Sequence, residues 1–224
     1  MTLRTNSKVA GFAFLAYIAV ALSGMILHSR ASAGEGTAAK LANIGQHAGW
    51  MRAGIVLEML GCFCALILAV TLYAITRDQD RDLALLGATF RIAEGVIGAV
   101  SLQVTAATLR LATTADRPDA ATMETLGAFL FKVPWSSDLG ATFFAAGSTI
   151  FAYLLLRGRI VPAWLAGEGV AASILILVLL PLKLVGLVGR PITDVMWLPM
   201  LVFEVTLALH LIVKGARAPA RTTA

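Results

Sequence analysis

The chain has 224 residues, of which 58% are hydrophobic and only 14% are charged, and its mean hydropathy is +0.83. These values exclude an ordinary soluble domain, and apolar runs long enough to cross a hydrocarbon core of about 30 Å recur along almost the whole chain. The formal net charge of +5 does not indicate nucleic-acid binding, because the basic residues lie in short segments beside apolar runs, where headgroups and membrane topology explain them.

Taken in chain order, the apolar runs predict six transmembrane helices that form a single all-α domain over residues 1–224. The expected spans are 9–28, 51–75, 83–112, 138–156, 163–187 and 197–214. The first span has an alternative interpretation as a signal peptide, because Ala31-Ser32-Ala33 follows it in the pattern of a cleavage site. Its apolar core from Val9 to Leu27 is longer than the core of such a peptide, so we favour a retained helix.

An even number of spans places both termini on the same side of the membrane. Basic residues gather on that side in short segments, namely Arg4, Lys8, Arg77, Arg81, Arg157, Arg159, Lys214, Arg217 and Arg221. Short cytoplasmic segments are enriched in Lys and Arg, so we expect both termini in the cytoplasm.

Two longer loops on the opposite, outer side predict short interfacial helices. Residues 38–51 place Leu41, Ile44 and Ala48 on one face, and the stretch DAATMETLGAFLFKV after Pro118 shows a similar pattern. Such helices would either cover the outer end of the bundle or rest on the headgroups as connectors.

Charged residues inside the third span indicate a face that packs against other helices. The residues that share this face, within about 100° of arc, are Gly87, Arg91, Glu94, Gly98, Ser101, Thr105 and Thr108. Arg91 and Glu94 are three residues apart and are expected to pair on one helix. This face cannot contact lipid.

Four glutamates, Glu58, Glu94, Glu168 and Glu204, fall inside predicted spans. A charge at the centre of a membrane costs roughly 2.5 to 3.5 kcal/mol, so each should face the interior, pair with a cation or carry a proton. The acids outnumber the cations that could pair with them. We therefore expect a protonated glutamic acid, which would serve as a general acid, a proton carrier or a hydrogen-bonded tie between helices.

These residues predict a pocket for a hydrophobic or amphiphilic small molecule such as an isoprenoid, a quinone or a lipid. In this interpretation Glu94, Glu58 and Glu204 are the candidate catalytic residues, with a protonated Glu94 or Glu58 donating to an olefin or epoxide. The candidate ligand-binding residues are Arg91, Arg52, Tyr17, Tyr73, Tyr153, Trp197 and Glu168.

Two other functions remain open at this point, along with the question of enzymatic activity. The first is a non-catalytic sensor or assembly protein whose buried charges are structural ties, and the second is a small proton-coupled transporter. The expected partners are membrane lipids and a small molecule rather than nucleic acid, while a protein partner and oligomerisation stay undetermined.

Cofactor binding is not expected. Cys62 and Cys64 point about 200° apart on one helix, which excludes a local disulfide or zinc site. His28 and His47 lie near the outer surface and His210 nearer the inner one, so they do not predict a haem site at the middle of the membrane.

The order of several segments also resembles a family. The segments are KVAGFAFLAYIAVALSGM, RAGIVLEML, LALLGATFRIAEGVIGAV, GSTIFAYLLLRGRIVPAWLAGEGVAASIL and FEVTLALHLIVKG, with Arg52, Arg91, Glu94 and Glu204 as polar anchors. Over nearly the entire chain they are similar to an uncharacterised bacterial membrane family, domain of unknown function four-three-eight-six. The resemblance implies a six-helix protein of the bacterial inner membrane and supplies no activity or catalytic residues.

Overall fold

The computed structural model describes residues 1–115, 119–132, 135–189 and 192–217, and this part of the chain consists of helices and the loops between them, without strands. The helices are α1 (Leu3–Ala31), α2 (Gly36–Gln46), α3 (Ala48–Thr76), α4 (Arg81–Thr113), α5 (Ala120–Phe131), α6 (Trp135–Arg157), α7 (Ala163–Leu184), α8 (Ile192–Val195) and α9 (Leu198–Val213). The predicted all-α class is confirmed.

Within the described residues, six segments are long and apolar enough to cross a membrane: α1, α3, α4, residues 138–157 of α6, α7, and a span that joins α8 to α9. They match the six predicted spans one for one. Their outer faces carry exposed apolar side chains, for example Phe63 (52% exposed), Val96 (55%) and Val178 (53%), as lipid contact requires. The chain is a multi-pass membrane protein.

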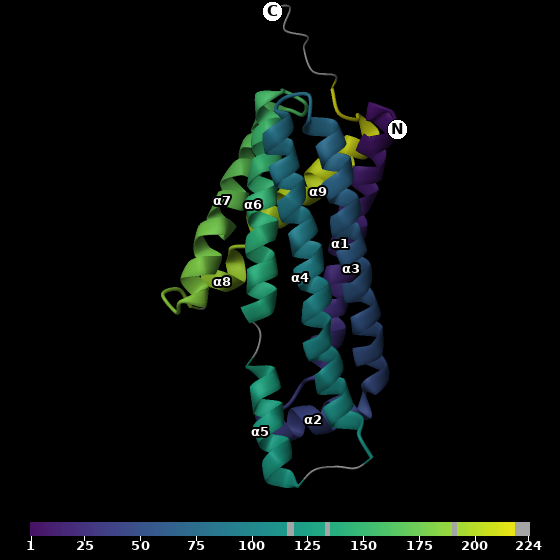
Figure 1. Cartoon of the computed structure of the whole chain (residues 1–224), viewed down its shortest axis with the longest axis vertical. Helices are drawn as coiled ribbons and strands as arrows, with labels where there is room; N and C mark the ends of the chain where they lie inside the picture. The colour runs from purple at the N-terminus through teal and green to yellow at the C-terminus, as the bar shows by residue number, and fades with distance from the viewer. Residues whose placement is uncertain (116–118, 133–134, 190–191, 218–224) are drawn as a thin grey trace, which may run out of the picture.

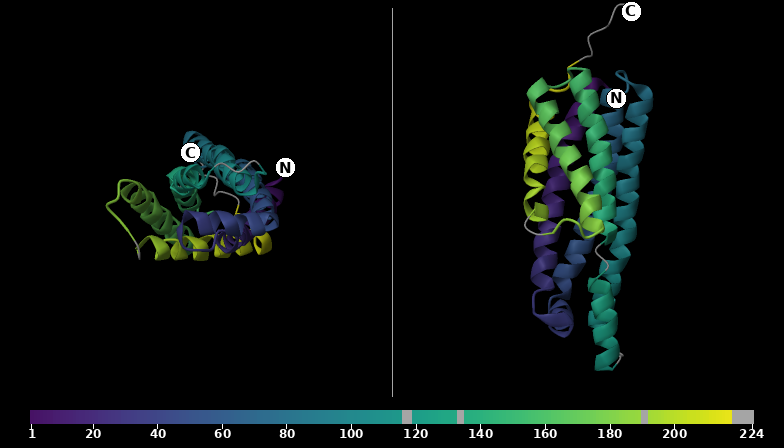
Figure 2. Two further views of the ribbon diagram at one scale, coloured as in Figure 1. Left: turned by 90° about the horizontal axis from the view of Figure 1, so that it is seen from below. Right: turned by 90° about the vertical axis from the view of Figure 1, so that its left-hand side faces the viewer.

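The six long segments pack in a closed ring. α1 contacts α3, α3 contacts α4, α4 contacts α6, α6 contacts α7, α7 contacts α9, and α9 returns to α1. Figure 1 shows the long helices running along one axis, with α9 crossing obliquely behind α4 and α6, and Figure 2 gives the same bundle from the end and the side. Any side chain that points to the middle of this ring leaves lipid and meets other helices.

Glycines let two pairs of helices in the ring approach closely. A Cβ added to Gly11 of α1 would lie 2.7 Å from the carbonyl oxygen of Ala208, and one on Gly169 of α7 would overlap the ring of Phe203. Both of these partners belong to α9. Small residues at these crossings therefore hold α9 against its two neighbours, as is common between membrane helices.

Several helices extend beyond the apolar runs that predicted them, because polar residues cap the extra turns. The hydroxyl of Thr2 accepts a hydrogen bond from the Thr5 amide at the start of α1, and the Asp80 carboxylate accepts one from the Leu83 amide at the start of α4. Asp80 also accepts a hydrogen bond of 3.2 Å from Arg157 of α6. The Leu83 amide, together with Arg157, holds the pKa of Asp80 below its usual value.

The two predicted interfacial segments are helices α2 and α5, and they lie together at the end of the molecule farthest from the termini (Figure 1). Leu41 and Ile44 of α2 are buried in a small apolar cluster with the ends of the long helices, and Met123 and Phe131 of α5 pack against it. The Asn43 amide donates to the carbonyls of Arg30 and Ala31, which caps the end of α1.

Both ends of the described chain lie at the opposite end of the bundle. The Ala216 amide donates to the Ser7 hydroxyl at 3.0 Å, and the Arg217 amide donates to the Ile160 carbonyl at 3.0 Å. The last described residues are thus tied both to α1 and to the turn between α6 and α7.

Candidate functional site

The predicted pair in the third span forms the centre of a buried polar cluster. Arg91 and Glu94 of α4 are 1% and 6% exposed, and their side chains approach to 3.0 Å between Nη1 and Oε2. Tyr17 of α1 donates its hydroxyl to the other carboxylate oxygen of Glu94 at 2.7 Å. The carboxylate of Glu94 therefore has both a cation and a hydrogen-bond donor beside it.

Aromatic rings form a second layer around the guanidinium. The central carbon of the Arg91 guanidinium is 4.8 Å from the ring centroid of Phe144 on α6 and 5.5 Å from that of Tyr17. Ring faces attract a cation electrostatically, and this attraction strengthens where water is excluded. Three elements of the ring, α1, α4 and α6, thus contribute to the surroundings of one charge.

Glu204 brings a second carboxyl from α9. It is 5% exposed, and the charges of Arg91 and Glu94 act on it. Within the described part of the chain, its Oε1 atom and the three guanidinium nitrogens of Arg91 have no hydrogen-bond partner of acceptable geometry. The contact of Arg91 with Glu94 is therefore a close ion pair without an aligned hydrogen bond. The cluster contains two carboxyls and one cation.

A very small cavity lies beside Arg91. Besides Arg91, this cavity of about 10 Å³ is bordered by Ser148 and by apolar side chains from α1, α3, α6 and α9. Such a volume holds about one water molecule. This cavity has no room for an organic ligand.

Glycine on α6 makes room for the arginine. A Cβ on Gly147 would lie 3.0 Å from Cγ of Arg91 and 3.1 Å from the carbonyl oxygen of Gly87. A larger residue here would displace the Arg91 side chain from the ring of helices.

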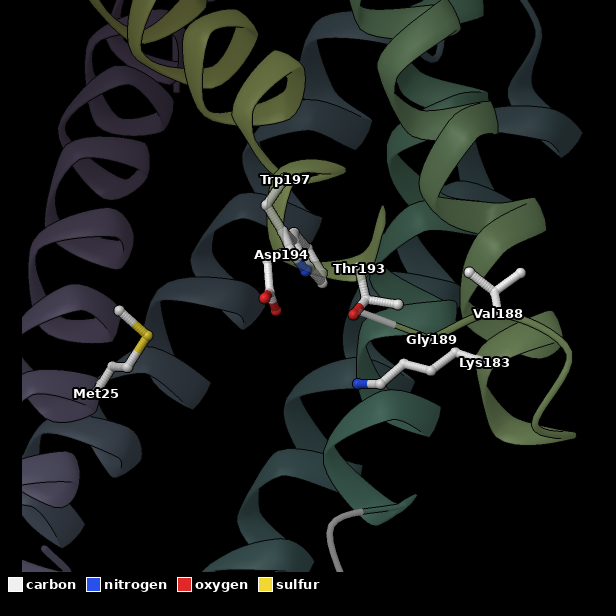
Figure 3. Close-up of a pocket in the computed structure, with 7 residues that line it drawn as sticks. All are labelled: Met25, Lys183, Val188, Gly189, Thr193, Asp194 and Trp197. Carbon is white, nitrogen blue, oxygen red and sulfur yellow. The ribbon is translucent and has the colours of Figure 1, made fainter. Parts of the chain in front are cut away.

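A larger pocket of about 520 Å³ lies near the C-terminal end of α7 and the start of α9, where Met25 of α1 faces residues 183–189 and 192–197 (Figure 3). Its described lining residues are Met25, Lys183, Val188, Gly189, Thr193, Asp194 and Trp197. In Figure 3 the polar ends of Lys183, Thr193 and Asp194 are directed towards the same space. Lys183 also forms an ion pair of 2.8 Å with Asp138 of α6.

Trp197 connects the pocket to the buried cluster. Its ring lies 6.2 Å from that of Phe144, and Phe144 in turn lies over Arg91. The pocket and the cluster are therefore neighbours separated by two aromatic side chains.

The structure brings half of the predicted site residues together. Tyr17, Arg91, Glu94 and Glu204 form the cluster, and Trp197 lines the adjacent pocket.

The other five predicted residues lie elsewhere. Arg52 is exposed near the start of α3, and Tyr153 is 44% exposed on the outer side of α6. Glu58 is half-buried on α3 opposite Gly24, Tyr73 packs against the main core, and Glu168 is half-buried near the start of α7. Helical periodicity places residues on one face of their own helix and does not tell how that face is turned in the bundle.

Several residues of these sites were not among the predicted ones. They are Phe144 beside the cluster, Asp138 as the partner of Lys183, and every described lining residue of the pocket except Trp197. Phe144 is an ordinary apolar residue in the sequence, and only its contact with Arg91 distinguishes it. The ion pair of Asp138 and Lys183 could have been predicted from the sequence, because the two residues lie at the same end of consecutive antiparallel spans.

The described residues contain no group of three or more His, Cys, Asp or Glu side chains that could hold a metal ion. Cys62 and Cys64 are free thiols, as their spacing predicted.

Comparison with known proteins gives one match. No curated protein and no solved structure matches the chain. Residues 9–215 match the family described as Domain of unknown function (DUF4386), which agrees with the resemblance of the quoted segments. The match covers all six membrane-spanning segments nearly in full, so the chain belongs to the DUF4386 family.

Proposed function

We propose that this membrane protein binds an amphiphilic small molecule in the pocket between α1 and residues 183–189 and 192–197. The observation that carries the proposal is the pocket itself, because its volume of about 520 Å³ falls within the range of roughly 300–1,000 Å³ that is usual for ligand sites. The lining combines apolar Met25, Val188 and Trp197 with a few polar groups, which is the composition of such sites.

The surroundings of the pocket favour a ligand with an apolar tail. Leu184, Val185, Leu187 and Leu198 are all exposed beside it, by 41%, 70%, 74% and 58% respectively. A hydrocarbon chain lying on these side chains would remain in the lipid phase while its head entered the pocket. An isoprenoid, a quinone or a lipid has this form.

The polar groups favour an uncharged, hydrogen-bonding head. The charge of Lys183 is already balanced by Asp138, with their atoms 2.8 Å apart, so a phosphate would have to compete for it. The Thr193 hydroxyl and the backbone at Gly189 offer hydrogen bonds to a carbonyl or hydroxyl group instead. Trp197 supplies a flat apolar surface against which a ring or an olefin would pack.

Catalysis by the buried glutamates would require the bound molecule to reach them from the pocket. Glu58, Glu94 and Glu204 are not among the described residues that line the pocket. For Glu94 or Glu204 to protonate an olefin or an epoxide, the reacting carbon would have to pass Trp197 and Phe144, which separate pocket and cluster. The geometry therefore supports binding better than catalysis.

Mass spectrometry of lipids that co-purify with the protein tests this function. Trp197→Ala removes one wall of the pocket, and we expect the bound molecule to be lost or reduced at least tenfold. Trp164→Ala is the matched control, because Trp164 is 65% exposed near the other end of α7 and far from the lining residues. Equal amounts of the same molecule in all three proteins would contradict the proposal.

A second function has support from the cluster. Its charges are buried, and the cavity beside Arg91 is too small for an organic ligand, as expected of structural ties between α1, α4, α6 and α9 in a sensor or assembly protein. If this is the main role, Glu94→Gln will lower the unfolding temperature while the amount of co-purifying lipid stays unchanged.

We also infer a location in the bacterial inner membrane with both termini in the cytoplasm. The end of the bundle that carries the termini also carries Arg77, Arg157 and Arg159 in short turns, which is the arrangement typical of a cytoplasmic face.

A further inference from the structure

The polar cluster at the centre of the bundle contains more carboxyl groups than cations. Arg91 is the cation of the cluster, and Glu94 and Glu204 are its two carboxyls, all of them at most 6% exposed. If both carboxyls were ionised, the cluster would carry a net negative charge inside the membrane. An uncompensated charge in such a place is far more costly than a neutral acid.

The contacts distinguish the two carboxyls. Glu94 lies 3.0 Å from the Arg91 guanidinium and accepts a hydrogen bond of 2.7 Å from Tyr17, and both contacts favour its ionised form. Glu204 has no comparable donor, since its buried Oε1 atom lacks a hydrogen-bond partner in the part of the chain that the structure describes. The contacts of Glu94 thus stabilise a negative charge on its carboxylate, whereas Glu204 lacks such contacts.

Among the described residues, no second cation acts on Glu204. α9 packs against α1 and α7, and α1 contributes Tyr17, which donates a hydrogen bond to Glu94. The other ionisable residues of α1 are Arg4, Lys8, His28 and Arg30, which lie near its two ends. The ionisable residues of α7 are Glu168 and Lys183, near its two ends, and Lys183 is paired with Asp138. His210 lies six residues along α9 itself, and the charges that act on Glu204 are those of Arg91 and Glu94.

We infer that Glu204 holds a proton at neutral pH, so that the middle of the bundle is a proton-binding site in which Arg91 balances Glu94. The proton comes from water and returns to water when it is released, and no other bond forms or breaks. This site does not depend on the proposed ligand pocket. A buried carboxylic acid of this kind is the group that membrane proteins use to carry protons.

Infrared spectroscopy of the purified protein tests the inference, because a protonated carboxyl has a carbonyl stretching band that a carboxylate lacks. We expect wild-type protein at neutral pH to show this band, Glu204→Gln to lose one component of it, and Glu124→Gln to keep it unchanged. Glu124 is the control because it is an exposed glutamate on α5. Absence of the band from wild-type protein would overturn the inference without reference to any variant.

The assignment to Glu204 has its own test. A band component lost in Glu94→Gln but kept in Glu204→Gln would place the proton on Glu94 and overturn it. Unfolding temperature against pH gives a second measurement. Alkaline pH removes the proton from wild-type Glu204 and leaves two carboxylates beside one guanidinium, so the temperature should fall, whereas Glu204→Gln should resist the change. Equal alkaline sensitivity of both proteins would contradict the inference.

Discussion

Arg91 is the residue on which the centre of the bundle depends most. It forms an ion pair with Glu94, its charge acts on Glu204, and it lies against the rings of Tyr17 and Phe144, at 1% exposure. An ion pair in such a place contributes little net stability compared with apolar residues, because both charges lose their hydration. Losing only one partner is a different matter, since the other charge then remains buried alone.

Arg91→Met tests this dependence. The variant keeps an unbranched side chain, although a shorter one, and removes the charge, so Glu94 loses its cation, and we expect the free energy of unfolding to fall by about 3–5 kcal/mol. Chemical denaturation in detergent micelles measures the change. Arg110→Met is the control, because Arg110 is exposed on the same helix and its replacement should change stability by less than about 0.5 kcal/mol.

A double variant separates charge from packing. Arg91→Met combined with Glu94→Gln removes both charges, so it should be more stable than Arg91→Met alone. If the double variant is as unstable as the sum of the two single variants, the loss comes from packing against Phe144 and Tyr17 rather than from an unpaired carboxylate.

Asp80 provides a pH-dependent contact at the residue scale, outside the membrane spans. The hydrogen bond from the Leu83 amide, with the Arg157 contact, holds its pKa below the usual value. A carboxyl with a lowered folded-state pKa stabilises the fold above its unfolded-state pKa, and this contribution is lost as the pH falls through the folded-state pKa. The start of α4 should therefore loosen in acid.

Asp80→Asn checks this expectation. Asparagine still caps a helix but does not titrate, so the unfolding temperature of the variant should depend less on pH below neutrality than that of wild-type protein. Asp78→Asn is the control, because Asp78 is exposed in the same turn and its only described partner is Arg77 at 3.9 Å. A similar reduction in both variants would show that the cap at Leu83 is not the cause.

At the scale of elements, the crossing of α1 and α9 depends on Gly11. Its added Cβ would lie 2.7 Å from the Ala208 carbonyl oxygen and 2.6 Å from Cγ1 of Ile212. Because the first of these atoms belongs to the backbone, Gly11→Ala must move one helix away from the other. Crowding of this kind costs typically about 1–3 kcal/mol.

Thermal unfolding of Gly11→Ala and Gly167→Ala measures this crossing. The second glycine lies in α7 with no atom within 4 Å of its added Cβ, so its replacement should cause no loss of stability. The expected result is a lower unfolding temperature for Gly11→Ala alone. An unchanged temperature in both variants would mean that α9 does not need the close contact seen with α1.

The third and first predicted spans show how far the helices could be predicted from the sequence. Hydropathy predicted a span at 83–112, and α4 runs from Arg81 to Thr113. The agreement is close because a single apolar segment in lipid must satisfy its backbone hydrogen bonds internally, which a helix does. Hydropathy predicted a first span at 9–28, whereas α1 begins at Leu3, since the polar turn before Val9 is held by the Thr2 cap and by contact with the C-terminal segment. Hydropathy does not report such contacts.

The site was predictable only within one helix. Arg91 and Glu94 pair as their spacing of three residues indicated, and the face from Gly87 to Thr108 has no exposed member. Contacts between helices were not predictable, because each depends on the rotation of one helix relative to another. Hence Phe144 was missed, and Tyr153, a predicted ligand-binding residue, is 44% exposed on α6.

At the scale of the whole molecule, the ring of helices gives the protein two different ends. One end carries the termini and the short turns, tied together by Arg157 with Asp80 and by Arg217 with Ile160. The other end carries α2 and α5 (Figure 1). The proposed ligand pocket lies beside α8 at the C-terminal end of α7, which is the end of that span opposite the short basic turn (Figures 1 and 3). If the basic residues of the short turns mark the cytoplasmic face, the pocket opens near the outer leaflet, and its ligand must be available there.

Labelling of single cysteines in intact cells determines this orientation. The background is Cys62→Ser with Cys64→Ser, which removes both free thiols of the chain. We expect a membrane-impermeant maleimide to label Glu35→Cys, in the exposed loop between α1 and α2, and to label Asp78→Cys in the turn between α3 and α4 only after the cells are broken. The reason is that short basic turns are retained in the cytoplasm. Labelling of Asp78→Cys in intact cells, with Glu35→Cys protected, would reverse the orientation and place the pocket at the cytoplasmic leaflet.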